Sequence, residues 1–356
     1  MMNQKKEYLP LKNIALPILA IAGATAFFYY ASFILIPLIV SISLAFILAP
    51  AVSLLKKLKI PHSLAVIFPL LIIVILFGLF GYLIFLQAQS LILDLPNYWS
   101  GFLDFLTQAK DNINSLIQSV GGKEIQAQDF LQNLKLKDLS GVTKFLFKGI
   151  GSVISLFFSG FLAIFLTFFI LNDQRGIKNK LTKALGSSQE EVSQKVLDEI
   201  NTKIKDFILI KFLITVGLAI VFTIGLLIIG VNYAYIWGPL AAVLNLVPFV
   251  GPVVALIPPL IVAGIEFGSI LPMIWVLIFY LAVQNLENYV ITPKLLGNKI
   301  NLSPLVVLLS TMYWGWLWGA IGVILAIPIT AAVKVICDNV KSLEPIGIML
   351  AGGKEV

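Results

Sequence analysis

One short run of polar residues stands out because apolar residues surround it in the sequence. Gln284, Glu287 and Asn288 are three and four positions apart, so they share one face of a helix. A carboxylate in apolar surroundings is costly unless it meets a partner or a solvated cavity. We therefore expect a site for a cation, a proton or a polar solute. The alternative is a structural helix end in which Glu287 is paired with Lys294 or Lys299.

A second candidate site is a run of helix-breaking residues inside another apolar stretch. The run Asn245-Leu-Val-Pro248-Phe-Val-Gly251-Pro252 contains two prolines, each of which removes a backbone donor and clashes with the preceding helical turn. Such a break frees carbonyl groups at one half-helix and amide groups at the other, and these groups bind ions or polar solutes. We expect Asn245, Pro248, Gly251 and Pro252 to line a transport path. The alternative is a kinked helix that only packs.

Two further charged residues mark the start of a long apolar segment. Asp206 and Lys211 are five residues apart, and we expect them to form a salt-bridged helix entrance rather than a coupling site. Cys337 and His62 are the single cysteine and the single histidine, so Cys-rich metal sites and a Ser-His-Asp arrangement have almost no residues to draw on. We expect no enzyme, no metal and no cofactor, apart from coupling to H⁺ or Na⁺.

The composition places these residues in a membrane protein. Of the 356 residues, 59% are hydrophobic and 12% are charged, whereas a soluble domain has about a quarter charged residues. One helical crossing needs about 20 apolar residues. Uncharged gaps of about that length or longer lie between Lys12 and Lys56, Lys59 and Asp94, Lys148 and Asp173, Lys211 and Glu266, Glu266 and Glu287, and Lys299 and Lys334. We predict an all-α, polytopic transmembrane helical bundle.

The positions of the charges also predict a topology. The formal net charge is +7, but most lysines lie between the expected spans, so we interpret them as topology signals and expect membrane lipid, not nucleic acid, as a partner. Basic residues favour the cytoplasm, which places both termini, the loop at 56–59 and the loop at Lys294 inside. If 236–265 crossed the membrane completely, the loop at Lys294 would lie outside. Its expected position inside therefore favours a broken hairpin at 236–265 that enters and leaves the membrane on the same side.

These signals divide the chain into five parts. Spans are expected at 14–31 and 34–54, which form a hairpin, and at 64–88, 149–171, 207–230 and 268–286. Two short arms at 303–333 meet at Trp314–Gly319, either as a re-entrant hairpin or as two short spans. Apolar residues at helical spacing predict an extracytoplasmic amphipathic helical insert after the third span. The parts are a membrane hairpin with the third span (1–88), the insert (89–146), the fourth span with a cytoplasmic helical loop (147–206), a transport region with broken hairpins (207–338) and a cytoplasmic tail (339–356).

The late motifs resemble those of a known family. The runs NLVPFVGPVVALIPP (245–259), QNLENYVITPKLLG (284–297), LSP (302–304) and GVILAIP (322–328) are similar to the signature blocks of the autoinducer-2 exporter (AI-2E) family of permease-like proteins. The resemblance covers nearly the whole chain. It adds Pro293, Gly297 and Pro304 as secondary candidates, beside Asp206 and Lys211. It also implies a homo-oligomeric transporter of the bacterial inner membrane without an ATPase domain.

The resemblance implies export of a small hydrophilic signalling molecule. An alternative is sodium/proton antiport, in which Glu287 would bind the coupling ion. A third alternative, from another functional class, is a membrane scaffold that moves no solute. No GxxxxGK[ST] motif is present, which argues against ATP-driven transport by this chain alone.

Overall fold

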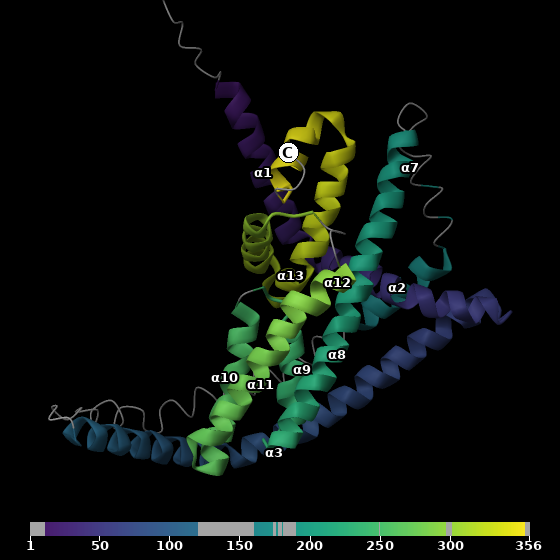
Figure 1. The fold of residues 1–356 in the computed structure, drawn as a ribbon. Coiled ribbons are helices and arrows are strands. Elements are labelled where there is room, and N and C mark those ends of the chain that lie inside the picture. Colours follow the sequence, from purple (N-terminus) through teal and green to yellow (C-terminus); the bar gives the residue numbers. More distant parts are fainter. Residues whose placement is uncertain are drawn as a thin grey trace, which may run out of the picture.

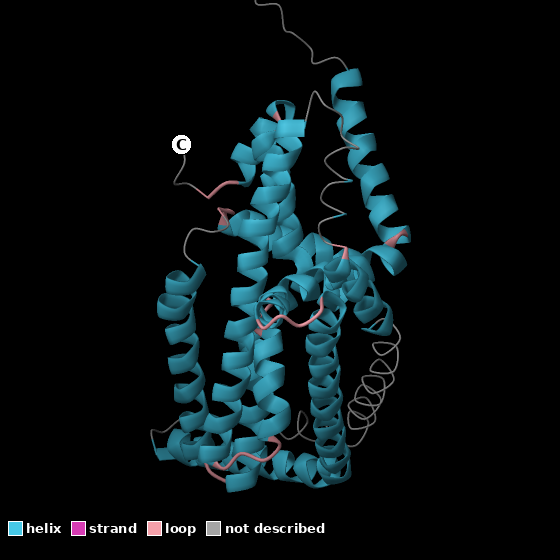
Figure 2. Cartoon of the chain, turned by 90° about the vertical axis from the view of Figure 1, so that its right-hand side faces the viewer, coloured by secondary structure: helices cyan, strands magenta, loops and turns pink. Residues whose placement is uncertain are grey.

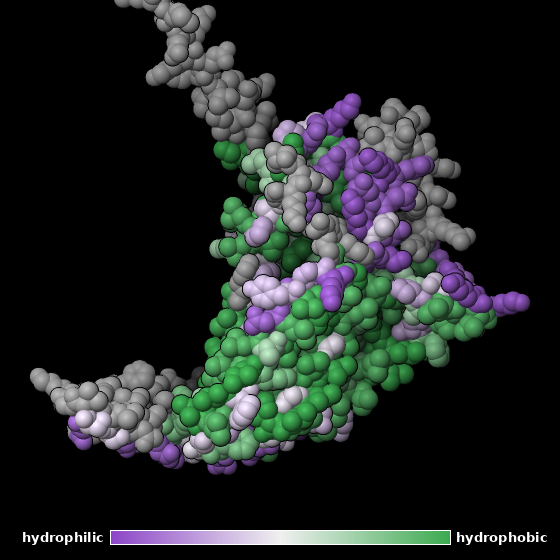
Figure 3. Space-filling view, in the orientation of Figure 1, coloured by the Kyte–Doolittle hydropathy of each residue, from purple (hydrophilic) through white to green (hydrophobic). Residues whose placement is uncertain are grey.

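A computed structural model describes residues 11–119, 160–173, 176, 180, 190–248, 250–296 and 301–352. Within these residues the chain forms helices and loops and no strand, which confirms the all-α class (Figure 2). Six of the described helices are long and apolar enough to cross a membrane. Figure 3 shows a broad apolar surface over α10 (Val250–Phe267) and α11 (Ile270–Leu286), with hydrophilic residues gathered toward α7 (Glu190–Glu199). The molecule is a polytopic helical membrane protein, as predicted.

The central bundle is built from helices whose limits match the predicted spans. α7 continues through a π-helical turn (Ile200–Ile204) into α8 (Lys205–Ile229), which corresponds to the predicted span at 207–230. α8 ends at Gly230, whose φ of 91° lies in the left-handed region, and α9 (Ala234–Leu244) packs back against α8. Helices α8 to α11 enclose the main apolar core, which includes Phe222, Leu226, Ala263 and Val276.

The predicted break within the bundle is present between α9 and α10. These helices are separated by residues 245–249, inside the predicted hairpin at 236–265, and they pack on each other. Gly251 permits this packing, because a Cβ atom at this position would overlap the carbonyl oxygen of Leu244. The two helices therefore form a tight helix–turn–helix unit. Its re-entrant placement in the membrane remains a prediction.

The first two helices meet where the sequence predicts a break, but they do not form the predicted hairpin. α1 (Leu11–Tyr30) and α2 (Ser32–Lys57) are separated by Ala31 alone. They diverge from this junction instead of lying side by side (Figure 1). An apolar cluster packs α2 against the start of α3 (His62–Ser119) and against the helix Gly160–Asn172, which covers the second part of the predicted fourth span. Packing against later helices thus decides the direction of α2.

α3 is one continuous helix that covers two predicted regions. The sequence predicts a span at 64–88 followed by a separate insert, but the helix passes residue 88 without ending and includes Pro96. Its second half lies across one end of the central bundle, below α8 to α11 in Figure 1. A change from apolar to amphipathic composition therefore does not end this helix. The remainder of the predicted insert (120–146) lies outside the described residues.

The last long helix is folded back on itself. α13 (Pro304–Asn339) contains Gly319 at φ 65° and ψ −144°, a non-helical conformation that separates two arms. Trp314 and Trp318 are buried near this tip, and Trp318 Nε1 donates a hydrogen bond of 3.0 Å to the carbonyl oxygen of Phe28 in α1. The predicted junction at Trp314–Gly319 is confirmed, and two of its three tryptophans pack the tip onto α1. The described residues also form the short helices α12 (Thr292–Leu296) and α14 (Glu344–Leu350) and a 3₁₀ turn (Lys341–Leu343).

Candidate functional site

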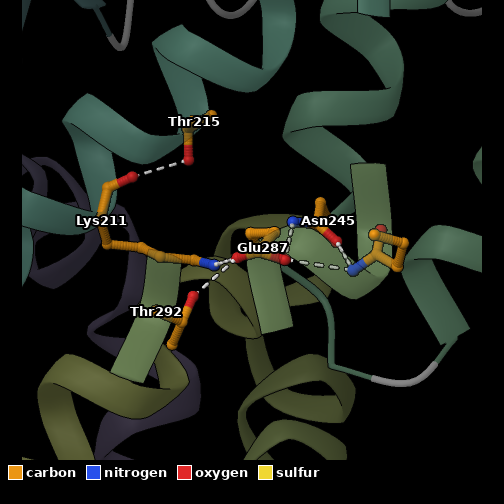
Figure 4. A network of polar contacts seen from close by, with 6 residues as sticks. Lys211, Thr215, Asn245, Glu287 and Thr292 are labelled. Carbon is orange, nitrogen blue, oxygen red and sulfur yellow. Dashed lines mark hydrogen bonds and ion pairs between the residues drawn. The ribbon is translucent and has the colours of Figure 1, made fainter. Parts of the chain in front are cut away.

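The candidate site is centred on the carboxylate of Glu287, at the end of α11. This residue is 2% exposed. Its Oε1 accepts from Lys211 Nζ at 3.1 Å and from Thr292 Oγ1 at 3.1 Å. Its Oε2 accepts from Asn245 Nδ2 at 3.0 Å and from Gln284 Nε2 at 3.1 Å. Figure 4 shows side chains from several segments converging on the one carboxylate.

The ion pair between Lys211 and Glu287 joins α8 to α11. The two residues are 76 positions apart, and their side chains are 22% and 3% exposed, respectively. A buried carboxylate is tolerated only when it is paired and when its remaining lone pairs are hydrogen-bonded. The ammonium supplies the compensating charge, and three neutral donors satisfy the rest of the carboxylate. The site is therefore electrically neutral although it contains two charges.

Asn245 brings the break between α9 and α10 into the site. It follows the last residue of α9, is 8% exposed, and its backbone N–H still bonds to the Ala241 carbonyl oxygen at 2.9 Å. Its Nδ2 donates to Glu287, while its Oδ1 accepts from Gln284 Nε2 at 3.1 Å. Both ends of the amide are thus engaged by α11. The break between α9 and α10 and the polar end of α11, which the sequence offered as two candidate sites, therefore meet in one site.

The other residues of the break shape the turn and do not bond to the carboxylate. The Pro248 carbonyl oxygen accepts from the Val250 N–H at 2.7 Å, which closes the turn locally. Pro252 lies in the first turn of α10, where a missing backbone donor carries little cost. Gly251 allows the close approach of α9 and α10 described above. Pro248, Gly251 and Pro252 therefore shape the turn that carries Asn245, and their place along a path stays a prediction.

Thr292 reaches Glu287 because the helix widens after α11. Residues Glu287–Ile291 form a π-helical turn, in which hydrogen bonds run from i to i+5 instead of i to i+4. Thr292 is the fifth residue after Glu287, and its backbone N–H bonds to the Glu287 carbonyl oxygen while its hydroxyl bonds to Oε1. In a regular α-helix, residues five apart lie on different faces. Thr292 was therefore not assigned to the site from the sequence, where α-helical spacing was assumed.

None of the other predicted residues that the structure describes forms a hydrogen bond or ion pair with the carboxylate. Asn288 is exposed and is not part of the network around Glu287. Asp206 is in the first turn of α8, but the ion pair of Lys211 is with Glu287 and not with Asp206 as predicted. The alternative interpretation, a structural helix end, paired Glu287 with Lys294 or Lys299. In the structure Lys211 is the partner of Glu287, and Lys294 is not. Pro293 lies in α12, Pro304 is the first residue of α13, and Gly297 and Lys299 are outside the described residues.

A second polar cluster lies at the other end of the bundle, where α8 and α10 end and α9 begins. This α3 cluster comprises Asp94 and Tyr98 of α3, Asn232 and Tyr233 of the loop after α8, and Glu266 of α10. Tyr98 donates to Glu266 Oε1 at 2.6 Å, the Asn232 N–H donates to Glu266 Oε2 at 3.0 Å, and the Tyr233 hydroxyl donates to Asp94. Burial and the bond to Asp94 raise the pKa of the Tyr233 hydroxyl. The isolation of Glu266 between two long uncharged stretches is the sequence signal for this cluster, which was not predicted.

The chemistry of the Glu287 site is that of polar-solute or cation binding. It brings one carboxylate, one ammonium, two amides and one hydroxyl together inside an apolar bundle. The amide of Asn245 offers both a donor and an acceptor, so it can exchange its protein partners for those of a solute. The site lies near α12, where the apolar surface meets hydrophilic residues in Figure 3.

Comparison with known proteins agrees with this chemistry. The chain matches the model of the AI-2E transporter family over residues 16–342. The AI-2 transport protein TqsA of Escherichia coli is 27% identical over 327 residues, which cover 90% of each chain. A Borreliella burgdorferi protein, whose name assigns it provisionally to transport, is 29% identical over 324 residues, 90% of this chain and 85% of its own. These names indicate transport rather than catalysis, and the chain belongs to the AI-2E transporter family.

Proposed function

We propose that this protein is a secondary transporter or facilitator that exports a small polar metabolite, of the autoinducer-2 kind, across the bacterial inner membrane. The observation that carries the proposal is the neutral, buried polar site of Lys211, Asn245, Gln284, Glu287 and Thr292 within an apolar helical bundle. In the proposal the protein is homo-oligomeric, and both of its termini face the cytoplasm. The name of the TqsA relative supports autoinducer-2 as the first solute to test.

The proposed solute contacts follow from the donors and acceptors of the site. Asn245 and Gln284 hydrogen-bond to each other and to Glu287. A hydroxyl or carbonyl group of the solute can take the place of one of these partners and form an equivalent hydrogen bond to the amide. The charges of Lys211 and Glu287 compensate each other, which suits an uncharged solute. The tip of the α9–α10 unit holds Asn245, so movement of that tip opens one side of the site.

The test is transport by the purified protein reconstituted into liposomes, with autoinducer-2 supplied on the cytoplasmic side. Gln284→Leu removes the two amide bonds to Asn245 and Glu287 and should reduce the initial rate by a factor of about 5 to 30, the effect of losing one or two contacts of about 1 kcal/mol each. Asn285→Leu is the matched control. Asn285 is the neighbouring amide and is exposed, and among the described residues its side chain bonds only to the Leu281 carbonyl oxygen of its own helix.

Both variants are first compared by size-exclusion chromatography, so that the rates refer to folded protein. Reduced transport by Gln284→Leu with parent-like transport by Asn285→Leu supports the site. Equal rates for the parent and Gln284→Leu would place the path elsewhere. No movement of autoinducer-2 by the parent, relative to empty liposomes, would remove this solute from the proposal.

A second candidate function is sodium/proton or other cation/proton antiport, and one observation favours it. The Lys211 ammonium lies 3.1 Å from Glu287 Oε1, in a position that a transported cation could take when the lysine withdraws. Glu287→Gln keeps the size of the side chain and removes its charge. In proteoliposomes with an imposed pH gradient, it should abolish ²²Na⁺ flux that the parent supports. Sodium flux of equal size in both proteins would exclude Glu287 as the coupling residue.

A membrane scaffold without transport is the remaining alternative. It predicts that neither autoinducer-2 nor ²²Na⁺ moves in liposomes containing the folded parent protein. The same two assays therefore separate all three functions.

A further inference from the structure

One buried hydroxyl lies on the same face of α11 as the candidate site. Tyr280 is 4% exposed and precedes Gln284 by four positions and Glu287 by seven. At 1.5 Å per residue it lies about 6 Å and about 10 Å from those residues along the helix axis. Four and seven positions are one and two helical turns, so the three side chains form one stripe. The stripe runs from the polar site into the middle of the bundle.

The stripe faces α8, the helix that supplies Lys211. The Tyr280 ring stacks on Phe222 of α8, with ring centroids 4.5 Å apart and an angle of 28° between the planes. Phe222 is 1% exposed and follows Lys211 by eleven positions, about three helical turns, so both residues lie on one face of α8. We call this line of contact between α8 and α11 the α8–α11 seam. It holds the ion pair of Lys211 and Glu287 near one end and Tyr280 deeper inside.

The environment of the Tyr280 hydroxyl differs from that of Glu287. Among the described residues this hydroxyl has no hydrogen-bond partner, whereas the Glu287 carboxylate has four. Leaving a buried hydroxyl unpaired is costly, and phenylalanine would fill the same apolar space without that cost. Packing with Phe222 explains the ring and gives no reason for the hydroxyl. A passing solute or ion would provide the missing partner.

We propose that the Tyr280 hydroxyl is a second contact for the transported solute, deeper along the α8–α11 seam than the Glu287 site. It donates a hydrogen bond to a hydroxyl or carbonyl oxygen of a small polar solute after that solute leaves Gln284 and Asn245. The inference rests on the proposed function, because it adds a binding position to the same path. It assigns to Tyr280 a role in solute recognition rather than in folding.

The first experiment compares Tyr280→Phe with the parent in autoinducer-2 transport and in thermal unfolding. Because the hydroxyl has no partner in the part of the chain that the structure describes, the variant should unfold at the same temperature as the parent or higher. Its half-saturating concentration for autoinducer-2 should rise by a factor of about 2 to 10, the value of one neutral hydrogen bond. Tyr313→Phe is the matched control, since the Tyr313 hydroxyl bonds to Thr25 Oγ1 at 2.9 Å, away from the seam. Parent-like transport by Tyr280→Phe would overturn the inference.

A second experiment does not depend on the identity of the solute. In a Cys337→Ser background, Tyr280→Cys should react with the small polar reagent methanethiosulfonate ethylammonium. Leu226→Cys is the control, because Leu226 is 0% exposed in the same core and also leaves a void when shortened. Labelling of Tyr280→Cys alone supports a solvated path at this position, even if the parent moves no autoinducer-2. Absence of labelling, or equal labelling of both variants, would refute the second contact.

Discussion

Removal of the Lys211 ammonium should destabilise the protein by several kcal/mol. Glu287 is 2% exposed, and its Oε1 lies 3.1 Å from Lys211 Nζ. Removing one partner of a buried ion pair typically costs about 3–5 kcal/mol, because the other charge is left in a medium of low dielectric constant. Three neutral donors remain on the carboxylate, and the Lys211 side chain is 22% exposed. We therefore expect Lys211→Met to cost about 3 kcal/mol, the lower end of the range.

The measurement is the free energy of unfolding in detergent micelles, obtained by denaturant titration and followed by circular dichroism. The matched control is Lys203→Met, on the same continuous α7–α8 helix. Lys203 lies 3.3 Å from Glu199, but these side chains are 50% and 28% exposed. An exposed pair of this kind contributes about 0–1 kcal/mol, so the control should unfold within about 1 kcal/mol of the parent.

The double variant Lys211→Met/Glu287→Gln separates the ion pair from the loss of either side chain. It removes both charges, and the glutamine amide oxygen still accepts hydrogen bonds from neighbouring amides. We expect it to recover about 2 kcal/mol of the loss, a value within the range of interaction energies of close, coupled pairs. A Lys211→Met variant as stable as Lys203→Met would contradict the role of the ammonium as the compensating charge of Glu287. A double variant less stable than Lys211→Met would contradict it too.

Three other predictions test the packing and the topology. Gly251→Ala places a methyl group on the Leu244 carbonyl oxygen and should lower the free energy of unfolding by about 1–3 kcal/mol or more, whereas Gly217→Ala, with open space around it, should be neutral or stabilising. A Cβ atom at Gly101 would lie 3.9 Å from that of Ile265, so Gly101→Cys/Ile265→Cys should form a disulfide on oxidation, seen as a gel shift that the matching double serine variant does not show. A cysteine at Lys294 should react with an impermeant maleimide only from the cytoplasmic side, and labelling from outside would contradict the positive-inside argument.

The membrane segments could be predicted because the lipid phase imposes a strong and local rule on the sequence. Uncharged stretches of sufficient length predicted the regions now occupied by α8, α11 and α13. Local chemistry also predicted both breaks, since proline and glycine interrupt helices through their own backbone. The residues at 245–249 separate α9 from α10, and Gly319 divides α13. These features depend on neighbours in the sequence, which is why they were predictable.

The partners within the site could not be predicted in the same way. Glu287 and Gln284 were identified from their spacing on one helix, but the pairing of Glu287 with Lys211 spans 76 positions and depends on how α8 packs against α11. Thr292 was missed because α-helical spacing does not apply across the π-helical turn. The divergence of α1 and α2 likewise depends on packing with later segments. Tertiary contacts decided each of these features.

The two tight helix tips determine where the structure can bend. At Gly251 and at Gly322, a single added methyl group would overlap the carbonyl oxygen of Leu244 or Trp314 in the opposing arm, so each helix pair behaves as a rigid body. A rearrangement of the α9–α10 unit as a whole would bend the links at its base, where Gly230 and Gly268 have φ values of 91° and 55°. A small rotation at these hinges is largest at the distant tip, which carries Asn245. Bending at these hinges would therefore make or break the hydrogen bond between Asn245 and Glu287.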